Sequence, residues 1–155
     1  GGLASRFNGK YGRYEVRAKV DRGNGFGSAI LLWPTSERWP IEGEMDISEV
    51  PKGDRGFSGS YFHYNSNNTV VGHQENGDFS TWHTYALDWQ PGKLTYYLDG
   101  RAVFTVNNGA VPSTNHFLAL QFDVGAKGAF IPPRDSSTPS SVTMHVDYVR
   151  VYANN

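Results

Sequence analysis

Three carboxylates lie close together in a segment whose other residues are typical of a buried strand. Residues 43–50 read Gly-Glu-Met-Asp-Ile-Ser-Glu-Val, which places Glu44, Asp46 and Glu49 among apolar neighbours. Carboxylates are costly to bring together away from water, and at least one of such a group holds its proton to a higher pH. That is the condition for a general acid near neutral pH. The segment therefore predicts acid–base chemistry, with a solvated edge strand or a calcium site as the alternatives from these residues alone.

The spacing of the three acids requires an irregular strand. Side chains alternate along a strand, so Glu44 and Asp46 share a face, whereas Glu49 would fall on the other one. A β-bulge around Ile47 and Ser48 returns Glu49 to the face of its neighbours. We then expect the Glu44 and Glu49 carboxyl groups roughly 5 to 6 Å apart, close to the spacing of about 5 to 5.5 Å that suits a retaining glycosidase. A spacing of about 6.5 to 9.5 Å would instead indicate inversion.

The rest of the chain predicts strands rather than helices. Alternation between apolar and polar residues is clear from Tyr14 to Val20, and an almost continuous apolar run from Ser28 to Trp33 indicates a strand buried on both faces. Further strands are expected at 59–64, 82–89, 94–98, 101–106, 116–124 and 142–152, with loops at 34–40, 75–81 and 125–141. We expect an all-β fold, a β-sandwich jelly roll of two antiparallel sheets with a concave cleft.

The sequence resembles glycoside hydrolase family 16, the retaining endo-β-glycanases built on a concanavalin A-like jelly roll. The segment Trp39-Pro-Ile-Glu-Gly-Glu-Met-Asp-Ile-Ser-Glu49 matches the family's Trp-Pro-x-x-Gly-Glu-x-Asp-x-x-Glu signature. Supporting matches lie at 11–19, 31–34, 82–89, 98–100 and 146–152. The resemblance implies Glu44 as nucleophile, Asp46 as its assistant and Glu49 as acid/base.

The same resemblance guides the expected domain organisation. Family members usually carry several dozen residues before the Tyr-Gly-Arg strand, and here ten residues precede Tyr11. We therefore expect a single family 16-like domain over residues 1–155 that lacks the usual N-terminal strands. A missing N-terminal segment would then complete the sandwich.

Composition excludes several other classes. The formal net charge of −1 provides no electrostatic basis for binding nucleic acid or an anionic membrane, and no apolar stretch approaches the ~18 residues of a membrane span. With no cysteine, disulfides and thiolate chemistry are excluded. Aromatic residues make up 14%, which supplies flat apolar faces for sugar rings.

Four further residues are candidates for substrate binding. Trp39 lies in a loop five residues before Glu44 and is expected to form a platform for a sugar ring, whereas Trp33 belongs either to the core or to the cleft rim. His63 lies on the following strand, where the family carries a histidine near the acid/base, so it is expected to hydrogen-bond Glu49 and adjust its proton affinity. Gln121 matches a position where the family often has an amide able to contact a sugar hydroxyl.

The resemblance also bears on metals, substrate and location. Asp147 resembles a closing-strand aspartate that helps to hold a structural calcium in many relatives, although catalysis by two carboxylates needs no cofactor. The bulged spacing is typical of β-1,3-glucanases, agarases and carrageenases, and we expect a secreted enzyme that acts on β-1,3- or mixed-linkage β-glucan. A non-catalytic lectin-like domain, a transglycosylase and a hydrolase of agarose or carrageenan are the alternatives.

Overall fold

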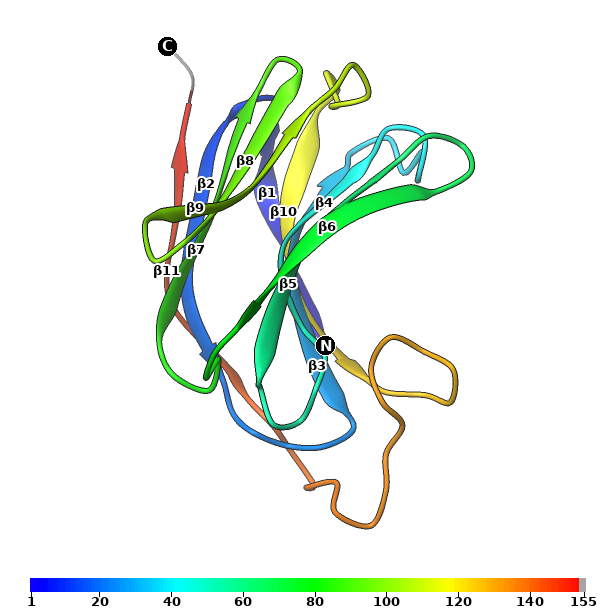
Figure 1. The fold of residues 1–155 in the computed structure, drawn as a ribbon, viewed down its shortest axis with the longest axis vertical. Helices are drawn as coiled ribbons and strands as arrows, with labels where there is room; N and C mark the ends of the chain where they lie inside the picture. Colours follow the sequence, from blue (N-terminus) through cyan, green and yellow to red (C-terminus); the bar gives the residue numbers. More distant parts are fainter. Residues whose placement is uncertain (154–155) are drawn as a thin grey trace.

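The computed structural model describes residues 1–153 as two antiparallel β-sheets packed face to face (Figure 1). One sheet has the strand order β1 (Gly2–Gly9), β10 (His116–Val124), β3 (Phe26–Pro34), β4 (Glu44–Val50), β5 (Phe57–Tyr64) and β6 (Thr69–Asn76). The other has the order β11 (Met144–Tyr152), β2 (Gly12–Val20), β7 (His83–Gln90), β8 (Lys93–Leu98) and β9 (Arg101–Asn107). Asn154 and Asn155, the last two residues of the expected domain, lie outside the described residues.

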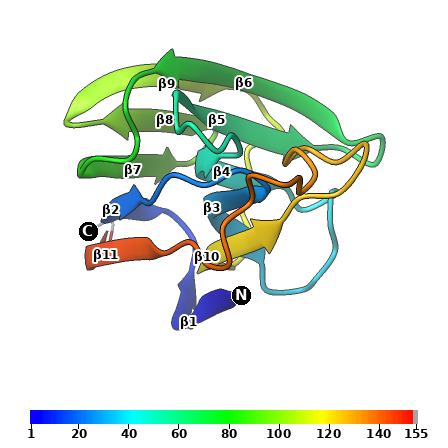
Figure 2. The same ribbon diagram turned by 90° about the horizontal axis from the view of Figure 1, so that it is seen from below.

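The expected β-sandwich is confirmed, and its edges are easiest to follow in Figure 2. The edge strands β1 and β11 lie toward one side of the molecule, and the edge strands β6 and β9 lie toward the other. Strand β4 lies near the middle of its sheet, with two strands on one side of it and three on the other. The three acids on β4 therefore lie near the middle of that sheet. Within residues 1–153 no helix is long and apolar enough to cross a membrane.

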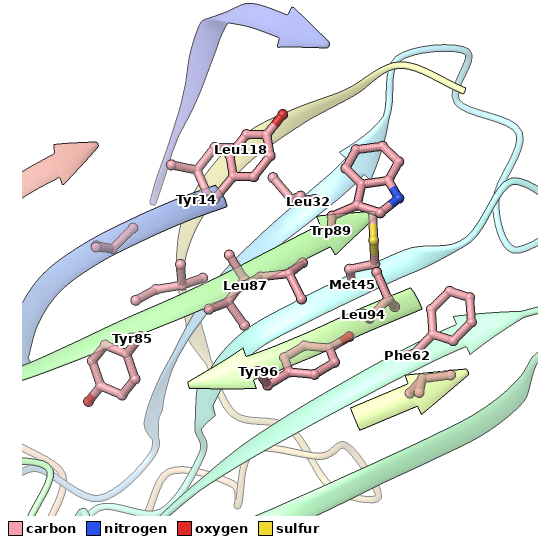
Figure 3. Close-up of a cluster of buried hydrophobic side chains, with 14 of the residues drawn as sticks. Tyr14, Leu32, Met45, Phe62, Tyr85, Leu87, Trp89, Leu94, Tyr96 and Leu118 are labelled. Atoms are coloured by element: carbon pink, nitrogen blue, oxygen red, sulfur yellow. The ribbon is translucent and has the colours of Figure 1, made fainter. Parts of the chain in front are cut away.

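A single apolar core fills the space between the sheets (Figure 3). Strand β2 buries alternate residues, as its sequence pattern predicts, and Trp89 on β7 is fully buried with its indole N–H donated to the carbonyl of Pro112. Met45 and Phe62 point into the core from β4 and β5, so their sequence neighbours point out of the opposite face. That outer face is the one that carries the acids.

Three sequence expectations need correction. Strand β3 is not buried on both faces, because Ala29 and Trp33 are half-buried and lie on the outer face beside the acids. Strand β1 was not expected, because it is an exposed edge strand with little apolar alternation. Strand β6 runs from Thr69 to Asn76 and takes in the start of the loop expected at 75–81, because an exposed edge strand accepts polar residues.

A buried arginine fixes the turns at one end of the sheet. Arg55 is fully buried and donates to five backbone carbonyls, including those of Asp21, Phe26 and Lys52 at 2.7 to 2.9 Å. Burial lowers the pKa of Arg55 to about 10, so the guanidinium stays charged near neutrality. It joins the β2–β3 turn to the β4–β5 turn, beside the end of the strand that carries Glu49.

Candidate active site

The predicted bulge lies in β4, between Asp46 and Glu49. On the β3 side, Ile30 pairs with Ser48 and the next residue pairs with Asp46, so Ile47 has no partner. On the β5 side, the register also shifts between Asp46 and Glu49. A bulge of one extra residue is the irregularity that the spacing of the acids requires.

The bulge turns two consecutive residues toward the interior. Ile47 and Ser48 are each 2% exposed, and the Ser48 hydroxyl lies 2.8 Å from the hydroxyl of Ser58. Glu49 is thereby returned to the outer face, where it lies opposite Gly59 of β5. Glu44 and Glu49 line the same pocket, which also includes Gln121 of β10 and residues of the 125–141 loop.

Burial and mutual repulsion give the two glutamates different proton affinities. Desolvation, followed by the charge of Asp46, raises the pKa of Glu44 to about 7. Desolvation raises the pKa of Glu49 to about 8, with further contributions from the charges of Asp46 and Glu44. Both pKa values lie well above that of a free carboxyl, so the group of acids keeps a proton near neutral pH, which is what a general acid needs.

His63 forms an ion pair with Asp46, so the expectation that it hydrogen-bonds Glu49 is wrong. Its Nε2 lies 3.3 Å from the Asp46 carboxylate, and its Nδ1 lies 2.9 Å from the side-chain oxygen of Asn68. The reason is register, since His63 pairs with Glu44 across the sheet whereas Glu49 pairs with a glycine four residues earlier.

Asp46 and His63 each change the proton affinity of the other. Hydrogen bonding to Asp46 raises the pKa of His63 to about 9 against the opposing effect of burial, and Asn68 adds to the rise. Burial raises the pKa of Asp46, and His63 opposes that change. The positive charge of His63 lowers the pKa of Glu44 and of Glu49, so the pair helps to set the charge on both.

Trp39 and Trp33 form an aromatic pair at the Glu44 end of the cleft. The indole N–H of Trp39 donates to the Glu44 carboxylate at 2.6 Å, and its ring is 39% exposed. Trp33 stacks on it at 6.1 Å with an angle of 8° between the planes, and donates to Glu37 at 2.9 Å. Of the two positions considered for Trp33, core or cleft rim, the structure places it at the rim.

Two positions bear on metal binding. Ligand atoms of Glu44, Asp46 and His63 lie within 4.8 Å of one another, a spacing that could hold an ion. Glu44 already accepts the Trp39 N–H, and Asp46 already forms an ion pair with His63. Asp147 accepts a hydrogen bond from Arg17 at 2.8 Å on the other sheet, so a calcium ion there would have to displace a cation.

Sequence reasoning missed three residues of this region. Asn68 lies in the turn between β5 and β6, and its left-handed backbone with φ of 52° brings its amide to His63. Tyr61 of β5 and Phe130 of the 125–141 loop lie with ring centres 6.4 Å apart, and Phe130 lines the pocket that contains Glu49. The alternation of β5 could have placed Tyr61 on the face of Glu49, whereas no local pattern could have placed Phe130.

Two carboxylates of raised pKa that line one cleft are the groups that a glycoside hydrolase uses, and here a bulged strand of a β-sandwich presents them. The family model "Glycosyl hydrolases family 16" matches residues 1–149, and the chain belongs to this family.

Two of the relatives cover the chain almost completely, and a third covers about two thirds of it. It is 28% identical to a "Glucan endo-1,3-beta-glucosidase" of Cryptopygus antarcticus over 99% of this chain and 66% of that protein. A structure of LamA from Zobellia galactanivorans in complex with laminaritriose and laminaritetraose aligns with a TM-score of 0.83 and 26% identity, covering 98% of this chain and 69% of that one. A "Beta-1,3-glucan-binding protein" of Penaeus monodon is 33% identical over 68% of this chain and 34% of that protein. The chain spans between about a quarter and two thirds of the curated relatives that it matches.

Proposed function

We propose that the protein hydrolyses internal linkages of a β-linked glucan with retention of configuration, most directly a β-1,3- or mixed-linkage glucan. The observation that carries the proposal is the pair of glutamates on one bulged strand, both lining one cleft, with a pKa of about 7 for Glu44 and about 8 for Glu49. Names of relatives support the substrate class, because they include an endo-1,3-beta-glucosidase and a protein crystallised with laminari-oligosaccharides.

The chemistry follows from which carboxyl carries the proton. Glu49 protonates the departing glycosidic oxygen while the Glu44 carboxylate attacks the anomeric carbon and forms a glycosyl-enzyme. Glu49, now ionised, then takes a proton from water, and that water releases the sugar from Glu44. The indole N–H of Trp39 orients the Glu44 carboxylate through a hydrogen bond. The partly exposed ring of Trp39 offers a platform for a pyranose. Because the substrate is a polymer, we also propose that the protein acts outside the cell.

A direct assay tests the reaction and its stereochemistry. The protein is incubated with laminarin, lichenan, agarose and xyloglucan, while new reducing ends and product lengths are followed. We expect new reducing ends from laminarin or lichenan, with the first product detected by proton NMR as the β-anomer. A first product with the α-configuration would refute retention, and chain lengths redistributed without new reducing ends would indicate a transglycosylase.

A non-catalytic glucan-binding domain is the second candidate, and one comparison favours it. The Penaeus monodon relative carries the name of a binding protein. The three acids argue for catalysis, since binding alone gains nothing from carboxylates held above their usual pKa. Retardation in a laminarin gel without any new reducing ends would support this second candidate.

A further inference from the structure

Two aromatic rings that the proposed chemistry does not use lie near Glu49. Phe130 lines the cleft, and the ring of Tyr61 lies over Gly59, the residue that pairs with Glu49. Tyr61 on β5 and Phe130 on the 125–141 loop lie with ring centres 6.4 Å apart and planes at 89°. We propose that these two rings form a binding subsite for a neutral pyranose unit of the substrate chain, on the β5–β6 side of Glu49. The inference rests on the proposed function and adds a specificity-determining pair to it.

The Tyr61 ring lies flat on the sheet because two glycines make room for it. Gly59 precedes it by two residues on β5 and shares its face, and Gly72 pairs with it from β6. A Cβ at either glycine would collide with the Tyr61 ring. The Tyr61 hydroxyl accepts a hydrogen bond from Gln74 at 2.6 Å, which holds the ring in place. One face of the ring is thus presented to the cleft in a fixed position next to the residue that pairs with Glu49.

Phe130 is held upright at the wall of the same cleft. Its side chain is 53% exposed, although it belongs to a loop with fixed contacts. The loop is joined to the β2–β3 turn by a hydrogen bond from the Gly125 N–H to the Gly25 carbonyl at 2.9 Å. Ile131, which lines the pocket beside Phe130, packs where a Cβ on Gly27 would stand 2.6 Å from its Cγ1. A large apolar side chain that is both exposed and anchored is suited to contact a ligand.

We call the place where Tyr61 and Phe130 meet the corner. Its shape and charge determine which class of ligand it can bind. A pyranose presents C–H groups on its faces, and these pack against the faces of aromatic rings. Tyr61 would cover one face of the sugar and Phe130 its edge. Phe130 lines the pocket of the two glutamates; among the described residues that line this pocket there is no lysine or arginine, whereas Glu44, Glu49 and Asp123 are acidic. A sulfated sugar would meet repulsion here, so the subsite suits a neutral glucan.

The corner mirrors the aromatic pair at the opposite end of β4. Trp39 contacts Glu44, and Tyr61 lies over the glycine that pairs with Glu49. A sugar chain in the cleft would therefore meet aromatic rings at both ends of the catalytic strand. The affinity of such a cleft for a polysaccharide would rise with the number of sugar units bound along it, and binding would not require a chain end.

The test compares Tyr61→Ala and Phe130→Ala with the unchanged protein on laminarin. Trp82→Ala is the matched control, because Trp82 is an exposed aromatic that contacts Arg17 on the sheet without the acids. Each corner variant should raise KM roughly 3- to 10-fold with little change in kcat, while the control stays within error. Tyr61→Phe and Phe130→Leu keep a ring or an apolar side chain and should show smaller effects; they replace the alanine variants if those do not fold.

Binding separates this inference from the proposed reaction. Migration in laminarin-containing gels measures affinity without turnover, and corner variants should be retarded less than the unchanged protein. If the unchanged protein is active but corner variants keep its KM, the subsite is refuted while the hydrolase stands. A lower KM in Tyr61→Ala would also refute it, because the ring would then narrow the cleft. If the protein shows no hydrolysis but corner variants still lose retardation, the reaction fails and the subsite stands.

Discussion

Replacement of Glu49 by glutamine should remove activity and stabilise the folded protein, increasingly so as the pH rises. A carboxyl whose pKa is raised from 4.5 to about 8 binds its proton more tightly in the folded chain than in the unfolded one. Its contribution to stability is complete below about pH 4.5 and is lost as the pH rises toward 8. Desolvation is the largest cause of the shift, followed by the charges of Asp46 and Glu44.

The shift sets the size of the effect. With a free-energy change of about 1.4 kcal/mol per pKa unit, the loss amounts to under about 1 kcal/mol at pH 5 and on the order of 3 kcal/mol at pH 7. Glutamine has nearly the same shape but no charge, so the Glu49→Gln variant escapes this loss. The fixed cost of burying its amide is the same at both pH values and cancels in the comparison.

Urea unfolding of both proteins at pH 5 and pH 7 measures the difference. Glu42→Gln is the control, because hydrogen bonding to Ser36 lowers the pKa of Glu42; its contribution to stability is already present at pH 5, so its replacement should change the stability by nearly the same amount at both pH values. A gain in stability for Glu49→Gln that is the same at both pH values would contradict the reasoning, as would a variant that is less stable at pH 7 than at pH 5 relative to the parent.

Other measurements test the remaining parts of the site and fold. The pH profile of kcat/KM should rise through about 7 as Glu44 ionises and fall through about 8 as Glu49 loses its proton, and a profile that peaks near pH 5 would contradict both assignments. Glu44→Ala should lose hydrolysis and regain turnover with added azide, giving a product of inverted configuration that NMR can detect. Asn68→Ala should lower the pKa of His63, followed by NMR titration of its ring, because the bond at Nδ1 is lost. Arg55→Met should destabilise the protein by about 3 kcal/mol in urea unfolding, since five carbonyls lose their donor, and a loss below about 1 kcal/mol would show that water replaces it.

The sequence predicted those parts of the fold that follow from local periodicity. Strand β2 and the hairpin of β7 and β8 have alternating or turn-bounded patterns, and the structure confirms them. The bulge could be located because three acids on one face are incompatible with a strict period of two. Edge strands β1 and β6 gave no such signal, since neither has a face that must be fully buried.

Contacts between segments that are distant in the sequence could not be predicted from local residue patterns. His63 was expected near Glu49 because it lies on the next strand, yet only the register of β4 against β5 decides which acid it faces. Arg55 carried no sign of burial, because its acceptors are backbone carbonyls on separate turns. Phe130 reaches the cleft from a loop whose position depends on its contacts with the β2–β3 turn.

The bulge in β4 explains why the site and the core coexist on one strand. A regular strand could bury Met45 and Ile47 and expose Glu44 and Asp46, but it would then bury Glu49 among apolar side chains. The extra residue instead buries Ser48, whose hydroxyl finds a partner in Ser58, and turns Glu49 outward. The lost ladder pairing on the β3 side falls on Ile47, and the charge stays at the cleft. Deleting either residue of the bulge would leave the last acid four positions after Glu44, an even spacing that a regular strand keeps on the outer face, so the carboxylate would stay at the cleft and only the register shift would be lost.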